Sequence, residues 1–144
     1  TASYGGGAFL FSITTDDSGK FSVKQLWNNE KVEGYMGSPV VCKGHVYLHG
    51  RDKKFHCLSL EDGSVAWSTN EEFGDYWSMI YQGDRVLALD QKGELILFEA
   101  SPEEFKVLDR REISKKDPTW AHVGIDGDLV LVRSLKGIQV YRWQ

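Results

Sequence analysis

The feature that most constrains the fold of this chain is a repeated pattern of short apolar runs separated by turn residues. The pattern is clearest in residues 37–67, where four apolar runs alternate with three short polar segments. The last of these segments contains Asp62-Gly63, a pair that accepts the positive φ angles of a tight hairpin. We therefore expect one small antiparallel sheet with strands at Pro39–Cys42, Val46–Leu48, Phe55–Leu60 and Val65–Trp67.

The same pattern recurs along the chain at a nearly constant spacing. Trp67 follows Trp27 by 40 residues, and the turn glycines Gly44, Gly83 and Gly127 follow one another by 39 and 44 residues. A period of ~40–45 residues with four strands per repeat is typical of a β-propeller blade. No segment requires a helix, so we expect an all-β propeller of four-stranded antiparallel blades. A solenoid or a two-sheet sandwich is the alternative, although a sandwich does not explain one turn pattern that recurs three times.

These repeats divide the chain into four units of one propeller domain. The first is a half blade that holds only third and fourth strands and a crossing loop, two complete blades follow, and the last blade stops after its third strand. The total is about three and a quarter blades, whereas closed propellers have ~4–8. Because an open end leaves unpaired strand edges, we expect part of a larger ring or a ring completed by oligomerisation. The units are residues 1–34, 35–75, 76–116 and 117–144.

Three assignments in the later units rest on less regular patterns. Phe105–Leu108 is expected to be the fourth strand of the third unit, with Leu108 in the place of the tryptophan. The charged segment 109–118 is expected to be a solvated crossing loop. Trp120–Val123 is expected to be the first strand of the last unit.

Charge and composition exclude some classes of function. The net charge of −4 and the pI of about 5.5 give no reason to propose nucleic-acid binding. No apolar run approaches the ~20 residues of a membrane helix, and no signal-peptide pattern opens the chain. The expected strands place Cys42 and Cys57 two strand spacings apart, ~9–10 Å, beyond the ~7 Å limit for a disulfide. We therefore expect both to be buried free thiols.

The second unit carries a family resemblance. The run SPVV-x-x-G-x-VY, followed by C-L-S-L-x-D-G-x-x-x-W, resembles the blade motif of PQQ-like (quinoprotein alcohol dehydrogenase-like) β-propellers, Ala-x-Asp-x-x-Thr-Gly-x-x-x-Trp. Gly63 and Trp67 match this motif, while Cys57, Ser59 and Asp62 stand where the family has Ala, Asp and Thr. The third unit keeps neither the Gly nor the Trp. The Asp-Gly turn and the tryptophan are expected to serve packing between blades.

The closing part of the chain resembles the C-terminal end of such propellers, particularly those of planctomycete-type bacteria. The resemblance implies a C-terminal portion of a larger propeller and a periplasmic or extracellular location. Quinone enzymes of this family bind their cofactor at the mouth of the central channel, with calcium, an Asp base and aromatic stacking. Candidates for such a channel-mouth site are Trp77, Trp120, Arg51, Asp90 and Arg133, with Ser38 in the position equivalent to the two tryptophans.

Two interpretations of these candidates remain open. Tryptophan faces and arginines could clamp a planar anionic ligand by stacking and ion pairing. Alternatively, the tryptophans pack between blades and the charges are solvated. No catalytic residue and no metal site are expected, because no Gly-x-Ser-x-Gly turn occurs and the histidines His45, His49 and His56 lack a further ligand at a recognisable spacing.

Two functions follow, from different classes. The preferred one is a non-catalytic binding or scaffold module for a protein or other partner, as the resemblance to outer-membrane assembly lipoproteins implies, with no cofactor. The alternative is part of a quinone (PQQ)-dependent dehydrogenase, which would need a calcium-binding set of carboxylates that the sequence does not reveal.

Overall fold

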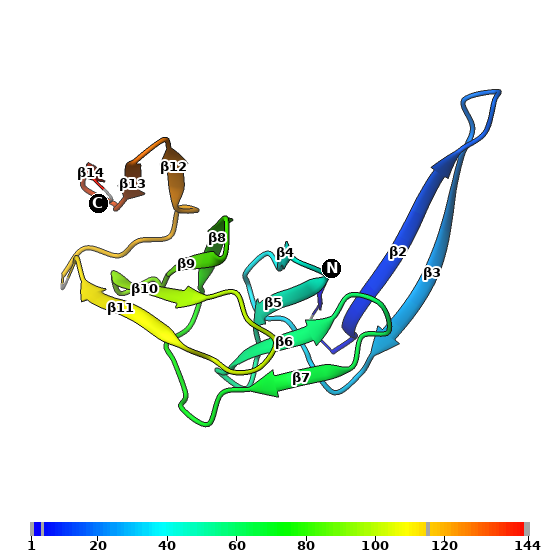
Figure 1. Cartoon of the computed structure of the whole chain (residues 1–144). Coiled ribbons are helices and arrows are strands. Elements are labelled where there is room, and N and C mark those ends of the chain that lie inside the picture. Colours follow the sequence, from blue (N-terminus) through cyan, green and yellow to red (C-terminus); the bar gives the residue numbers. More distant parts are fainter. Residues whose placement is uncertain (1, 4, 115, 143–144) are drawn as a thin grey trace.

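The computed structural model describes residues 2–3, 5–114 and 116–142, so the extreme ends of the first and last units lie outside the described residues. Within this part of the chain every regular element is a β-strand, and the fourteen strands form four antiparallel sheets (Figure 1). No helix in the described part is long and apolar enough to cross a membrane. The expected all-β architecture of a partial β-propeller is confirmed.

Each sheet is one blade, and its strands are hydrogen-bonded in chain order. The innermost strands β4, β8 and β12 face the concave side of the array in Figure 1, and the outermost strands of the two complete blades, β7 and β11, lie on its convex side. Blade 1 is β1 (Ala2–Ser3), β2 (Gly7–Thr15) and β3 (Phe21–Asn29). Blade 2 is β4 (Val40–Cys42), β5 (His45–His49), β6 (Phe55–Ser59) and β7 (Val65–Ser68). Blade 3 is β8 (Ser78–Gln82), β9 (Arg85–Leu89), β10 (Glu94–Glu99) and β11 (Val107–Glu112). Blade 4 is β12 (Gly124–Asp126), β13 (Leu129–Arg133) and β14 (Ile138–Arg142).

Three strand assignments differ from the sequence expectation. Blade 1 has an additional short strand, β1, which pairs with β2. The charged segment after Leu108 is not all loop, because β11 continues to Glu112, pairs with β10 and is exposed throughout. Arg110 on this strand donates hydrogen bonds to the carboxylates of Glu94 and Glu71, so ion pairs hold together a strand whose charges suggested a loop.

The first strand of blade 4 also lies later than expected. It is Gly124–Asp126 rather than Trp120–Val123, because Asp126 pairs with Leu129 across a two-residue turn. Gly127, the first turn residue, has a φ of 58°. This positive angle at the first turn position suits a tight hairpin, and it places the strand directly before the glycine.

A β-bulge in the outer strand of blades 1, 2 and 3 sets which residue holds the position that tryptophan has in blades 1 and 2. The register shift places Trp27 opposite Leu10 and Trp67 opposite Cys57. In blade 3 the same shift places Asp109 opposite Leu97. Asp109, rather than Leu108, therefore holds the tryptophan position of this blade, since the bulge adds one residue to the outer strand.

Tryptophans dock blade 1 onto a turn of blade 2 and blade 2 onto a turn of blade 3. The Trp27 indole N–H of blade 1 donates a 2.8 Å hydrogen bond to the Leu60 carbonyl of blade 2, and its ring covers Gly63. The Trp67 indole of blade 2 donates a 2.8 Å hydrogen bond to the Ser101 carbonyl of blade 3. The sequence expectation that the Asp-Gly turn and the tryptophan serve packing between blades is confirmed.

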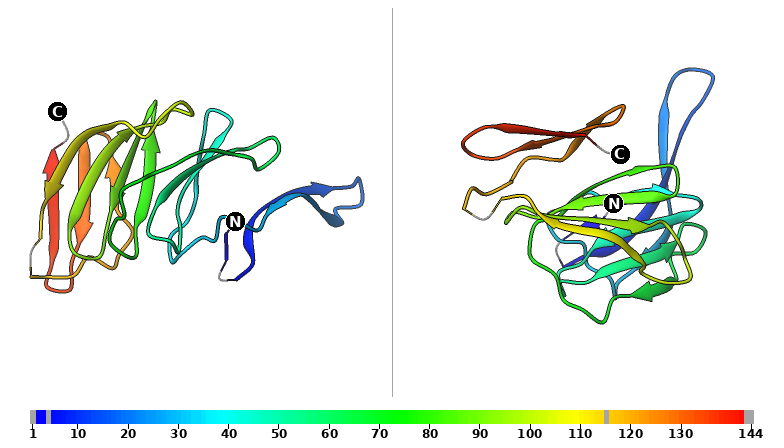
Figure 2. Two further views of the ribbon diagram at one scale, coloured as in Figure 1. Left: turned by 90° about the horizontal axis from the view of Figure 1, so that it is seen from below. Right: turned by 60° about the vertical axis from the view of Figure 1, so that its left-hand side comes forward.

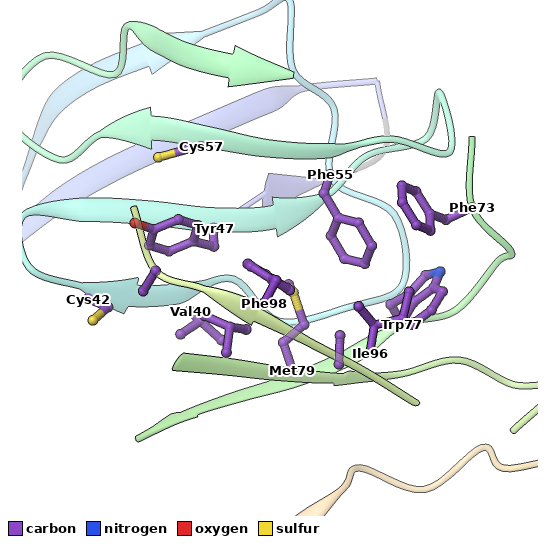
Figure 3. Close-up of a cluster of buried hydrophobic side chains, with 13 residues drawn as sticks. Val40, Cys42, Tyr47, Phe55, Cys57, Phe73, Trp77, Met79, Ile96 and Phe98 are labelled. Carbon is purple, nitrogen blue, oxygen red and sulfur yellow. The ribbon is translucent and has the colours of Figure 1, made fainter. Parts of the chain in front are cut away.

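An apolar core fills each of the three junctions. The largest joins blades 2 and 3 (Figure 3), and Phe105 packs against it, with its ring 5.5 Å from that of Trp67. Cys42 and Cys57 are buried free thiols in this core, as expected, and burial raises the pKa of Cys57 to about 11. The buried members of the smaller cores are Ala8, Val32, Val46, Leu48 and Leu58 between blades 1 and 2, and Leu87, Leu89, Val123, Val130 and Val132 between blades 3 and 4.

The contact between Trp27 and Gly63 predicts a selective effect of one added methyl group. A Cβ at Gly63 would lie 2.6 Å from the Trp27 ring. Gly19 has a similar φ, 81° against 74°, but an added Cβ there meets nothing within 4 Å. We expect Gly63→Ala to lower the free energy of unfolding by about 1–3 kcal/mol more than Gly19→Ala, because only the former overpacks a junction. Urea unfolding of both variants measures this difference, and equal losses would contradict the docking role of Gly63.

Candidate functional site

One end of the array collects the segments that precede the inner strands and the turns that follow the second strands. Neighbouring strands are antiparallel, so the start of β4 lies beside the end of β5, and the same holds in the later blades. Backbone hydrogen bonds join these segments, from Arg51 N to Glu33 O at 2.9 Å and from Thr119 N to Gln91 O at 2.9 Å. We call this end the channel-mouth rim, made of residues 33–37, 50–54, 74–77, 90–93, 118–123 and 134–137.

Trp77, a sequence candidate for ligand stacking, is a core residue. Its side chain is 1% exposed, and its indole N–H donates a 2.7 Å hydrogen bond to the Gly74 carbonyl. Its ring meets those of Phe55 at 5.1 Å and Phe73 at 6.0 Å in edge-to-face contacts. Trp77 therefore closes the junction between blades 2 and 3 and leaves no aromatic face free for a ligand.

Trp120, by contrast, lies at the surface and ends a row of three aromatic rings. It is 56% exposed and packs on Tyr76 with ring centroids 5.0 Å apart. Tyr76 in turn stacks on Tyr35 at 5.2 Å. The three residues precede the inner strands of blades 4, 3 and 2, so the row crosses three blades at the rim. We call Tyr35, Tyr76 and Trp120 the aromatic row.

The central residue of the row holds a strained backbone. Tyr76 has a φ of 61°, in the left-handed region that costs a residue with a Cβ about 1–2 kcal/mol. A Cβ on Gly37 would lie 2.3 Å from the Trp77 carbonyl oxygen, so the two loops that carry Tyr35 and Tyr76 are tightly interlocked. Strain of this kind persists where surrounding packing enforces it, and it is often found at binding sites.

The sequence analysis matched the wrong residue to Trp120, because it accepted spacings to the turn glycine of six residues for Trp77 and seven for Trp120. Trp120 was expected to be equivalent to Trp77, yet Tyr76 and Trp120 each lie seven residues before the first glycine of the following hairpin turn, Gly83 and Gly127. Trp77 lies only six residues before Gly83. Counting from the first residue of each turn would have identified Tyr76 as the partner of Trp120.

The charged candidates do not converge on the row. Asp90 is 2% exposed, and its carboxylate accepts hydrogen bonds from the backbone N–H groups of Lys92 at 2.8 Å and Glu94 at 2.7 Å. Burial raises the pKa of Asp90 despite these bonds. Arg51 pairs with Glu33 at 3.4 Å on the surface. Arg133 is an exposed residue that ends β13, and Ser38 is exposed before β4.

The positions of the candidate residues predicted from the sequence show whether they could bind a quinone cofactor. A planar anionic cofactor needs a free aromatic face and converging cationic groups, but Trp77 is enclosed and Asp90 is committed to its own turn. The candidate set does not fit the cofactor. Among the described residues, no group of three or more His, Cys, Asp or Glu side chains is placed to hold a metal ion.

A hydrogen-bonded chain of Ser68, His56 and Asp52 was not foreseen from the sequence. His56 Nδ1 lies 2.8 Å from Ser68 Oγ, and Nε2 lies 2.9 Å from the Asp52 carboxylate. His56 and Ser68 are also direct partners in the β6–β7 pairing, and an added Cβ on Gly50 would lie 2.6 Å from His56 Nε2. These hydrogen bonds thus connect the outer hairpin of blade 2 to the turn at 50–54, which is a structural role. Only the three-dimensional turn brings Asp52 onto the imidazole.

His49 is a buried histidine beside Trp77. Its side chain is 4% exposed, its ring lies 5.2 Å from that of Phe55, and Nε2 has no hydrogen-bond partner. Burial is the main cause that lowers the pKa of His49 to about 4. The folded protein therefore keeps this imidazole neutral at a pH where the unfolded chain binds a proton.

This buried imidazole predicts a pH-dependent contribution to stability. The pKa of His49 is lower in the folded protein than in the unfolded chain. The contribution of the neutral imidazole to the free energy of unfolding is therefore complete above pH ~6.5, the ordinary pKa of histidine, and decreases as the pH falls toward 4. The shift corresponds to about 3 kcal/mol at 1.36 kcal/mol per pKa unit. We expect the stability difference between the wild-type protein and His49→Phe to change by that amount across this range in urea titrations. Parallel curves for the two proteins would contradict the prediction.

Comparisons with known proteins agree with this architecture. The model of the family described as outer membrane protein assembly factor BamB matches residues 2–69. The solved structure of BamB from Moraxella catarrhalis has a TM-score of 0.60 and 16% identity, over 92% of this chain and 45% of that chain. No curated protein matches the chain in a sequence search.

Two quinone-enzyme structures are also similar. A europium-containing methanol dehydrogenase has a TM-score of 0.59 and 15% identity, over 77% of this chain and 23% of that chain. The quinohemoprotein alcohol dehydrogenase ADHIIG from Pseudomonas putida HK5 has a TM-score of 0.58 and 13% identity, over 76% of this chain and 19% of that chain. The chain thus spans less than half the length of each of these proteins. The family model thus matches residues 2–69, and the structural neighbours show that the chain has the fold of these propellers.

Proposed function

We propose that the chain is a non-catalytic PQQ-like β-propeller segment that binds a protein partner at the channel-mouth rim. The observation that carries the proposal is the exposure of Trp120. The indoles of Trp27, Trp67 and Trp77 all donate hydrogen bonds to carbonyl groups of the protein, whereas 56% of Trp120 is open to solvent. Exposed tryptophan and tyrosine are enriched among the residues that contribute most to protein interfaces.

The row is also suited to binding because its geometry is fixed in advance. Tyr76 stacks on Tyr35 and makes a tilted ring contact with Trp120, and the interlocked loops hold its backbone in place. A rigid aromatic surface loses little conformational entropy when a partner covers it. Met36 lies next to Tyr35 in the chain and is 57% exposed, so it extends the apolar surface.

Charges of both signs surround the row and favour a protein over a uniformly charged partner. The exposed Arg51 pairs with the half-buried Glu33, and the exposed Lys53 lies 3.8 Å from the half-buried Asp75. Such mixed charges contribute mainly to orientation and association rate at an interface. The rim thus has an apolar centre with a polar surround, which is the usual anatomy of a protein interface.

We also propose that the protein needs neither PQQ nor calcium for this binding and that it is located outside the cytoplasm. The enclosed position of Trp77 and the buried Asp90 argue against the alternative, a quinone-dependent dehydrogenase. The description of the matching family, outer membrane protein assembly factor, supports a periplasmic or extracellular location and a protein partner.

The partner proposal predicts a selective loss of affinity. The partner is first captured from a cell-envelope extract and purified. Trp120→Ala should then lower the affinity for this partner by at least about tenfold, as expected of an interface hot spot. Tyr81→Ala is the matched control, because Tyr81 is 52% exposed on β8 at the opposite end of the strand from Tyr76. Calorimetric titration of each variant measures the affinities. A partner whose affinity survives Trp120→Ala, or falls equally with Tyr81→Ala, would refute binding at the rim.

A second measurement tests the absence of cofactor chemistry. Purified protein should show no quinone absorbance, and incubation with PQQ and calcium should yield neither a retained chromophore nor dye-linked alcohol oxidation. A quinone that survives gel filtration would overturn the non-catalytic proposal.

A further inference from the structure

The part of the channel-mouth rim around Trp120 carries exposed cationic side chains. Backbone hydrogen bonds of 2.9 and 3.2 Å join the segment just before this ring to the turns 90–93 and 134–137. Each of these turns contains one exposed lysine, and a third exposed lysine lies in the segment itself. We call these residues the lysine cluster: Lys92, Lys116 and Lys136.

The carboxylates in the same three segments are bound to the backbone and do not lie open beside the lysines. Asp90 is 2% exposed and accepts hydrogen bonds from the N–H groups of its own turn. Asp117 accepts a 3.1 Å hydrogen bond from the backbone of the turn 134–137, and its other carboxylate oxygen is buried. The lysine cluster forms no ion pair with any described residue, whereas Arg51 and Lys53 elsewhere on the rim are paired.

The lysine cluster borders an exposed apolar centre. Trp120 is 56% exposed, and Leu135, in the turn that carries one of the lysines, is 65% exposed. Tyr76 packs against Trp120 with ring centroids 5.0 Å apart. These residues lie in turns at the ends of strands, and packing between blades uses the faces of the sheets, so a neighbouring blade lies beside this surface and not over it.

This cationic surface contrasts with the rest of the chain, whose net charge is −4. The left view of Figure 2 shows the sheets side by side, with the turns between strands gathered at two opposite ends of the array. Turns at the end opposite to the rim are acidic. Such a separation of charge attracts an anionic partner to the rim and repels it from the other end. The exposed carboxylates of the opposite turns are Glu61, Asp62, Asp84, Glu103, Glu104, Asp126 and Asp128.

We propose that the partner segment bound at the rim is an acidic stretch of protein that carries a large apolar side chain. This inference rests on the proposed function of the rim and adds the chemistry of the partner. Carboxylates of the partner pair with the lysine cluster, while its apolar side chain packs on Trp120 and Leu135. A nucleic acid or an anionic membrane fits less well, because the negative net charge repels an extended polyanion.

Two short peptides test the acidic preference directly. Fluorescence anisotropy compares a labelled, terminally blocked Glu-Asp-Phe-Asp-Glu peptide with its neutral counterpart Gln-Asn-Phe-Asn-Gln. In 0.1 M salt the acidic peptide should bind about two- to thirtyfold more tightly, the range expected of two exposed ion pairs. At 1 M salt the two affinities should become equal, because the Debye length falls from about 10 Å to about 3 Å.

Charge-matched variants locate this preference on the protein. The double substitution Lys92→Gln with Lys136→Gln should make the affinities for the two peptides equal. The control is Lys24→Gln with Lys43→Gln, which changes the net charge equally at exposed lysines on β3 and in the β4–β5 turn. The control should keep the preference for the acidic peptide. Circular dichroism and thermal unfolding check that both variants keep the wild-type fold.

Several results would overturn the proposal. These are equal binding of the two peptides to the wild-type protein, binding of neither, or an equal loss of preference in the control variant. Tighter binding of a single-stranded oligonucleotide or of phosphatidylglycerol vesicles than of the acidic peptide would also overturn it. If Trp120→Ala weakens the purified partner while the two peptides bind equally, the acidic chemistry is wrong and the rim remains the binding site.

Discussion

The contact on which the structure most depends is the docking of a tryptophan from one blade onto a turn of the next. Trp27 and Trp67 each cover a turn and donate an indole hydrogen bond to its carbonyl group, at Leu60 and Ser101. One such bond contributes only about 0.5–1.5 kcal/mol, but each partly buried tryptophan ring also removes apolar surface from water where it packs against the neighbouring core. The same geometry recurs at two junctions, so it fixes how blades 1, 2 and 3 are rotated relative to one another. The loops at the channel-mouth rim, and with them the aromatic row, take their positions from this rotation.

How well the strands of each blade could be predicted from the sequence depends on the turn residues between them. In blade 2 each turn has its own signal, such as Asp62-Gly63, and the expected strands lie within one or two residues of the observed ones. In blade 3 the outer strand was expected to end at Leu108, but it continues to Glu112, because Arg110 in the charged part forms ion pairs with Glu94 and Glu71 on other segments. The bulge that gives Asp109 the tryptophan position is invisible in sequence, since it depends on the register of two strands.

The candidate site shows the same limit. Sequence reasoning correctly placed Trp77 and Trp120 near the start of inner strands, but it could not tell which of them the neighbouring blade would enclose. Burial of Trp77 follows from contacts with Phe55 and Phe73, which belong to blade 2 and to the loop before blade 3. Tyr76, the centre of the aromatic row, was missed because Trp77 was matched to Trp120, although Tyr76 has the same spacing of seven residues to its turn glycine as Trp120. The hydrogen-bonded chain through His56 was missed for a similar reason, since Asp52 approaches it only through a turn.

The central claim is that three tryptophans hold the blades together while Trp120 is left open for binding. Hydrogen–deuterium exchange of the indole N–H groups, followed by NMR and assigned by single substitutions, tests this claim directly. The indoles of Trp27, Trp67 and Trp77 should exchange slowly, because each donates a hydrogen bond of 2.7–2.8 Å to a carbonyl group. The indole of Trp120 should exchange at nearly the rate of a free side chain. Rapid exchange at Trp27 and Trp67, or protection of Trp120 in the isolated protein, would contradict the account.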